Sequence, residues 1–181
     1  MKKSFIRFLY LGIISIILVS GCKPAVSIIS KNYNQNTPMI KRAFIRMHGL
    51  EGSKKFYLKL EDLLKNELDK RGITSEYYIS EQHQENQNLT DSSSIKMINL
   101  YKPDVIFYFN QTISKESWVK NETSDNDFSI EIRQLNDKSL LWKAYFTTYT
   151  FGAFEDAASL SCKRIIKRME KDGIIKRLNK N

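Results

Sequence analysis

Cysteine, histidine, glycine and proline are all scarce in this chain of 181 residues. It has two cysteines, two histidines, seven glycines and three prolines. Two cysteines allow at most one disulfide, which excludes a small domain stapled by several cystines. A hydrophobic content of 41% with so little glycine and proline argues for a folded globule rather than a disordered chain.

Motifs of common enzyme and metal sites are also lacking. His48 and His83 lie in no HxH or HxxxH pattern and in no cluster of cysteine and histidine, so no metal site is expected. The chain has no Walker motif, no Gly-x-Ser-x-Gly elbow and no Cys–His signature. We therefore predict no cofactor and no catalytic residues, and expect that the protein is not an enzyme.

Only one long apolar run exists, Phe8–Val19. As a helix, its twelve residues would span roughly 18 Å, whereas a membrane core needs about 30 Å. The run is therefore too short for a permanent span and is typical of a secretory signal, particularly with the basic residues before it, Lys2, Lys3 and Arg7.

The residues after this run, Leu18–Cys22 (LVSGC), resemble the lipobox of bacterial lipoproteins. The resemblance implies cleavage between Gly21 and Cys22 and acylation of Cys22 with palmitate-like chains. One acyl chain binds a membrane only marginally, but two or three should hold it firmly. We expect a signal peptide at 1–21, a tether at 22–24 and one globular domain at 25–181.

The lipobox also predicts location. The mature protein would be lipid-anchored in the cell envelope and in the periplasm, where nucleic acid is not an expected partner. Lys23 follows the cysteine in place of the aspartate that retains some lipoproteins in the inner membrane, which favours the periplasmic face of the outer membrane.

The hydrophobic pattern of the domain predicts an α+β fold, an α/β sandwich of order β-β-α-β-α-β-β-β-α. A mixed sheet would carry two main helices and one short helix. The expected strands are 25–30, 40–47, 73–79, 105–112, 128–135 and 141–151, and the expected helices are 53–71, 93–101 and 154–172. Residues 80–94 read as a solvated loop, and 105–112 as a central strand covered on both faces. Residues 128–135 and 141–151 should form a hairpin, with Trp142 and Phe146 in the core.

The positive charge is local. Residues 163–181 hold eight basic and two acidic residues, which equals the +6 expected for the mature chain. On a helix, one arc would bury Cys162 as an inert thiol, and the opposite arc would carry a basic stripe of Lys163, Arg164, Lys167, Arg168 and Lys171. This basic stripe could bind anionic lipid, an acidic protein or an envelope polymer, or be merely solvated.

The segment from His48 to Lys55 runs from a strand through two glycines into a helix. Its backbone amides and lysines are candidates for anion binding, namely Gly49, Gly52, Ser53, Lys54 and Lys55. The alternative is structural, with the glycines turning the chain, Ser53 capping the helix and the lysines solvated.

Three segments, Leu64–Gly72, Lys102–Ile106 and Leu135–Trp142, complete a pattern that resembles small envelope lipoproteins similar to the N-terminal domain of TolB. The resemblance implies a non-catalytic accessory or assembly role. The leading hypothesis is thus an anchored protein-interaction domain with an envelope protein partner and an undefined oligomeric state. The alternative hypothesis is a small-ligand or anion-binding module that uses residues 48–55.

Overall fold

The computed structural model describes residues 26–34, 38–50, 53–82, 92–115, 123–151 and 154–178. The strands are β1 (Val26–Asn32), β2 (Arg42–Leu50), β3 (Thr74–Gln82), β4 (Val105–Lys115), β5 (Thr123–Gln134) and β6 (Leu140–Phe151). The helices are α2 (Lys54–Asp69), α3 (Ser92–Tyr101) and α4 (Phe154–Lys171). This is the predicted order and the predicted α+β class. The signal peptide, Cys22 and His83 lie outside the described residues.

The strands form one mixed sheet in the order β1-β6-β5-β4-β2-β3. β2 pairs in parallel with β3 and β4, and the remaining pairs are antiparallel. The predicted β5–β6 hairpin is confirmed. Its turn is fixed by Asp137, whose carboxylate accepts a hydrogen bond from the Ser139 amide at 2.9 Å, and by Lys138, which adopts a φ of +57°.

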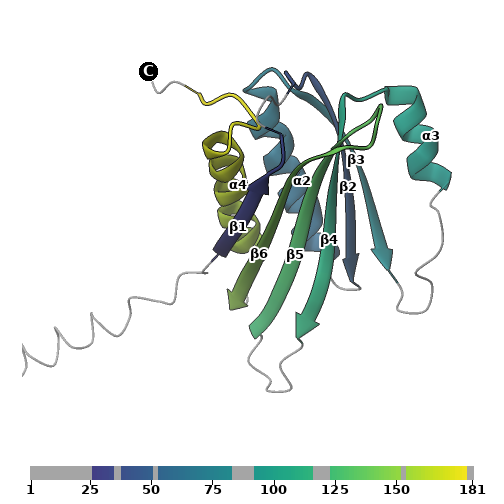
Figure 1. Ribbon diagram of the computed structural model, residues 1–181. Coiled ribbons are helices and arrows are strands. Elements are labelled where there is room, and N and C mark those ends of the chain that lie inside the picture. The colour runs from purple at the N-terminus through teal and green to yellow at the C-terminus, as the bar shows by residue number, and fades with distance from the viewer. Residues whose placement is uncertain are drawn as a thin grey trace, which may run out of the picture.

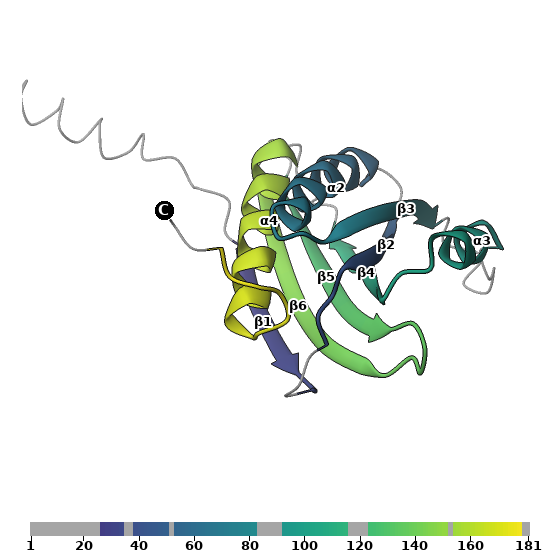
Figure 2. The same ribbon diagram turned by 90° about the horizontal axis from the view of Figure 1, so that it is seen from above.

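Helices α2 and α4 pack side by side on one face of the sheet (Figures 1 and 2). Between them and the strands lies the main core, in which Trp142 and Phe146 are buried as predicted. The predicted inner arc of α4 is also buried: Ala158, Cys162, Ile165, Ile166 and Met169.

Both main helices end at a glycine, as the sequence predicts. Gly72 and Gly173 have φ values of +74° and +73°. In each case the amide of the residue after the glycine donates a hydrogen bond to a carbonyl five residues earlier. Ile73 donates to Leu68, and Ile174 donates to Met169. This is the Schellman arrangement, which uses the left-handed conformation that glycine adopts at little cost.

Helix α3 lies on the other face of the sheet, over one corner only (Figure 2). There Ile98 packs with Phe44 of β2 and Ile106 of β4 in a second small core. The prediction that β4 is covered on both faces therefore holds only near this corner, since Tyr108 further along the strand is half-exposed. The predicted loop at 80–94 is also shorter at both ends, because β3 reaches Gln82 and α3 begins at Ser92.

An ion-pair cluster joins α2 to α4. The Arg71 side chain is 5% exposed and donates to Glu67 at 2.8 Å and to Glu170 at 2.6 Å. A second cluster fixes the end of α4 to the sheet edge, where Asp172 accepts hydrogen bonds from Ser30 of β1 and from Trp142 Nε1, the latter at 2.8 Å. Within the described residues, no helix is long and apolar enough to cross a membrane.

Candidate functional site: the open face of the sheet

The face of the sheet opposite α2 and α4 is largely uncovered by described elements, and Figure 1 looks onto it. We call this surface, away from the α3 corner, the open face. Strand register aligns five of its side chains in one row across β3, β2, β4, β5 and β6, which we call the charged row: Tyr78, Arg46, Tyr108, Glu131 and Lys143. Alternation along each strand places these residues opposite the core.

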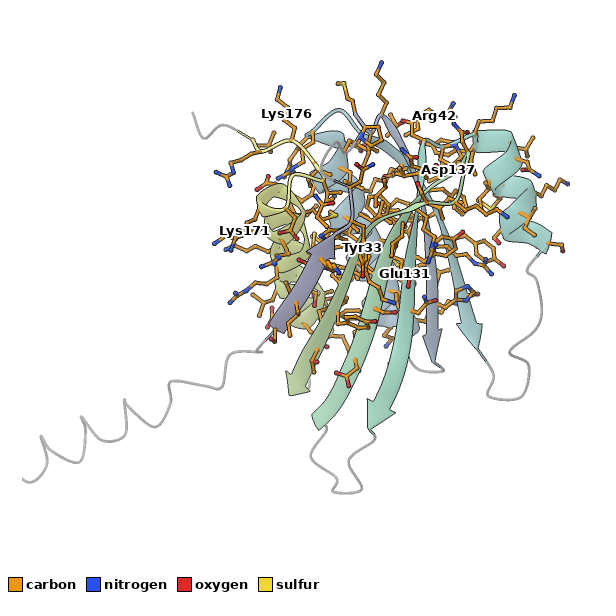
Figure 3. All side chains as sticks on the ribbon, viewed as in Figure 1. Tyr33, Arg42, Glu131, Asp137, Lys171 and Lys176 are labelled. Atoms are coloured by element: carbon orange, nitrogen blue, oxygen red, sulfur yellow. The ribbon has the colours of Figure 1, made fainter. Side chains whose placement is uncertain are left out.

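Glu131 occupies the middle of this face (Figure 3). Its carboxylate pairs with Lys143 at 2.7 Å and with Arg133 at 2.8 Å. The hydrogen bond from Lys143, joined by the one from Arg133, holds the pKa of Glu131 below its usual value despite partial burial. The same contact raises the pKa of Lys143. The Glu131 carboxylate is therefore fully paired, and together with Lys143 and Arg133 it leaves a net charge of +1 on this part of the open face.

Arg46 lies on the other half of the charged row. Its Nε is buried and has no hydrogen-bond partner among the described residues. Strand register places Tyr78 on one side and Tyr108 on the other. No described carboxylate forms an ion pair with it.

A shallow depression of about 400 Å³ lies on the open face beside Tyr108, the β4 neighbour of Arg46, and Arg46 itself does not line it. Tyr108 and Asn110 of β4 form one wall, and the β5–β6 turn forms the other. Apolar and charged side chains share its lining, which also includes Ile106, Glu131, Arg133 and Leu135. Because the depression is open rather than enclosed, its shape suits a segment of another molecule better than a fully sequestered small ligand.

The β1 edge of the open face is more apolar. Ile29 is 73% exposed and lies in register with Tyr145, which is 53% exposed. Lys143 Nζ lies 5.1 Å from the centre of the Tyr145 ring. An exposed aromatic and aliphatic pair beside a cation is typical of protein contact surfaces.

In the predicted anion-binding segment, residues 48–55, the glycine at position 49 serves side-chain packing. A Cβ at Gly49 would lie 2.2 Å from Cε2 of the buried Tyr57, so close packing requires the glycine. The Tyr57 hydroxyl donates to the His48 carbonyl at 2.9 Å. Gly52 lies outside the described residues.

Ser53 does not cap α2 with its side chain, contrary to the structural alternative. Its hydroxyl donates instead to Gln111 Oε1 on β4 at 2.7 Å. Lys54 and Lys55 are exposed. The structure thus gives Gly49 and Ser53 structural roles, and anion binding at 48–55 stays a prediction that no contact supports.

The basic stripe needs one correction. Arg168 is half-buried, and its Nε contacts Asp172 at 3.2 Å and Ser30 Oγ, so it belongs to the cluster at the end of α4. The other members, Lys163, Arg164, Lys167 and Lys171, are exposed. Cys162 is buried, which raises the pKa of its thiol to about 12 and fits the predicted inert role.

Sequence reasoning missed Arg46 and the charged row. The sequence does show one signal, an arginine inside the otherwise apolar strand segment Ala43–Met47. However, the partners of Arg46 in the charged row come from strands distant in sequence, and only the strand register brings them together.

No family model and no curated protein matches this sequence. Solved structures do match its fold. The PelC dodecamer of Paraburkholderia phytofirmans is 9% identical with a TM-score of 0.53, and the match covers 84% of this chain and 100% of the PelC chain.

More distant matches are a PDZ domain protein of Parabacteroides distasonis and a DUF330 protein of Xanthomonas campestris. The first is 12% identical over 81% of this chain and 36% of that chain, with a TM-score of 0.45. The second is 8% identical over 77% and 90%, with a TM-score of 0.42. The predicted resemblance to the N-terminal domain of TolB is therefore wrong, and the fold that this chain shares is that of PelC.

Proposed function

We propose that this chain is a lipid-anchored protein of the bacterial envelope whose domain is a non-catalytic assembly module, and that the open face is its contact surface. The lipobox at Cys22 carries the first part of the proposal. The open face supports the second, because it holds an arginine that pairs with no described carboxylate, and exposed apolar side chains.

The position of the first strand supports close anchoring. β1 begins at Val26, four residues after Cys22. Four extended residues reach about 14 Å, so the lipid would hold the β1 edge of the domain near the headgroups. Lys23 favours the periplasmic face of the outer membrane as the location.

The solved structure of PelC adds support for assembly. PelC shares this fold and is described as a dodecamer. At 9% identity this shows the fold alone, so a homo-oligomer of the present chain is one form of the proposal and a complex with another envelope protein is the other.

Site-specific photocrosslinking in intact cells tests the proposal. The photoreactive residue p-benzoylphenylalanine replaces Tyr145 on the open face or, as a control, Leu58 on α2. The two side chains are 53% and 50% exposed, so solvent access is matched. We expect a discrete adduct from position 145 and none from position 58.

The mass of the adduct identifies the partner as a second copy of the chain or another protein. Equal adducts from both positions, or none from position 145, would contradict the assignment of the open face as the contact surface.

A further inference from the structure

Arg46 differs from the other arginines that face the sheet or the helix ends. Arg133 and Arg168 each pair with a carboxylate, and Arg42 donates to the Tyr101 carbonyl. The buried Nε–H of Arg46 has no acceptor among the described residues. An unmet buried donor costs about 1–3 kcal/mol, and more when it is charged. The fold thus holds a cationic donor ready for an anion at a position where stability alone would favour an apolar side chain.

The surroundings of Arg46 suit a planar anion. Tyr78 and Tyr108 flank it in the charged row. A guanidinium offers parallel N–H donors that match the two oxygens of a carboxylate. Arg46 is half-buried as a residue, so part of its side chain is accessible from the open face, although its Nε is buried.

The only carboxylate of the charged row does not compete for Arg46. Glu131 lies two strands away, about 10 Å at ordinary strand spacing. It is already paired with Lys143 and Arg133. Because the proposed function is assembly with a protein, the anion expected at Arg46 is a side-chain carboxylate.

We propose that Arg46 binds the carboxylate of an Asp or Glu side chain from a protein partner, with the adjoining depression receiving the flanking residues. Tyr108 and Asn110 link the two features, because they line the depression and lie in register with Arg46 and His48. This inference rests on the proposed assembly function and names the chemistry of the partner.

The direct test observes the Arg46 Nε–H group by NMR in the ¹⁵N-labelled full-length protein, purified in a nonionic detergent. The signal is assigned by its loss in Arg46→Lys. The protein is titrated at constant ionic strength with Ac-Gly-Glu-Gly-NH₂, with Ac-Gly-Gln-Gly-NH₂, and with inorganic phosphate.

We expect the Glu peptide to move the Arg46 signal and the Gln peptide to leave it in place. No movement, or equal movement with both peptides, would overturn the inference. Tighter binding of phosphate than of the Glu peptide would also overturn it, because it would assign the site to a small anion.

Crosslinking from position 145 separates this inference from the proposed function. We expect Arg46→Gln to lower the adduct yield at least tenfold, and Arg164→Gln, an exposed change on α4, to leave it unchanged. The melting temperature of Arg46→Gln should equal or exceed that of the wild type, because the change removes an unmet buried charge.

If the adduct forms equally in Arg46→Gln, the inference fails and the proposed function stands. If the Glu peptide binds but position 145 gives no adduct, the proposed function fails and the Arg46 site stands.

Discussion

At the scale of single residues, Gly49 shows how a sequence pattern can have two readings. A glycine between a strand and a helix suggests exposed amides for an anion. In the structure the same glycine makes room for the ring of Tyr57, which is 1% exposed and donates to the His48 carbonyl. The nearest ring carbon would lie 2.2 Å from an added Cβ. Steric fit, rather than ligand binding, accounts for this position.

This account predicts the effect of Gly49→Ala. The methyl group would collide with the Tyr57 ring, so we expect the free energy of unfolding to fall by about 1–3 kcal/mol, as for other overpacked cores. Urea unfolding of the full-length protein in detergent would measure it.

The double variant Gly49→Ala, Tyr57→Leu provides the control, because the smaller side chain relieves the clash. Its loss should be smaller than the sum of the two single losses. Additive losses would show that the Tyr57 ring does not determine the residue at position 49.

Single residues also explain why the predicted resemblance to TolB was wrong. Each motif on which the resemblance was based has a local structural role. Gly72 ends a helix at positive φ, Asp104 accepts the Lys41 and Arg42 amides at 2.7 and 2.9 Å, and Asp137 closes a turn. Such solutions recur in unrelated proteins, so they predict local geometry well and family poorly.

At the scale of elements, the edge strand β1 is held by the end of α4 as well as by β6. The Asn32 side chain donates to the Asp172 carbonyl at 2.8 Å, while the Asp172 carboxylate binds Ser30, Trp142 and Arg168. Burial alone would raise the pKa of Asp172, but these hydrogen bonds and the Arg168 charge outweigh it and lower the pKa.

The lowered pKa predicts a pH dependence. Because the folded pKa lies below the unfolded value of about 4, the stabilisation is complete above that pH and is lost as pH falls through the folded pKa. We expect Asp172→Asn to cost about 1–2 kcal/mol at pH 7, with a gap to the wild type that narrows as the pH falls below about 4.

Chemical denaturation at several pH values measures this gap. Asp62→Asn is the control, since Asp62 is 63% exposed and lies at the 4.0 Å limit of an ion pair with Lys59. A gap for Asp172→Asn that stays constant down to pH 2 would contradict the account.

Elements were largely predictable from the sequence, and their arrangement on the open face was not. Apolar periodicity located the described strands and helices, because each buries one face. The prediction of an exposed basic stripe on α4 was wrong at Arg168. This side chain contacts Ser30 of β1 and Asp172, and the periodicity of the helix alone gives no sign of either contact. Arg46 was missed for the same reason, since its environment depends on pairings with distant strands.

At the scale of the whole molecule, the proposed function depends on both the lipid anchor and the open face. The chain enters the fold at the edge strand β1, and Ile29 of that strand borders Tyr145 on the open face. A lipid four residues before β1 would therefore keep the open face close to the membrane plane, where a laterally diffusing partner would meet it. Without the lipid, a weak carboxylate contact at Arg46 would have to form from dilute solution.

The most direct test of the central claim is the mass of the N-terminal peptide of the protein isolated from its native membrane. The account predicts a peptide that begins at Cys22 and carries two or three acyl chains, and predicts that Cys22→Ser lacks acyl chains and leaves the membrane fraction. An unmodified peptide that begins elsewhere, or a Cys22→Ser protein that stays in the membrane fraction as fully as the wild type, would contradict lipid anchoring at Cys22.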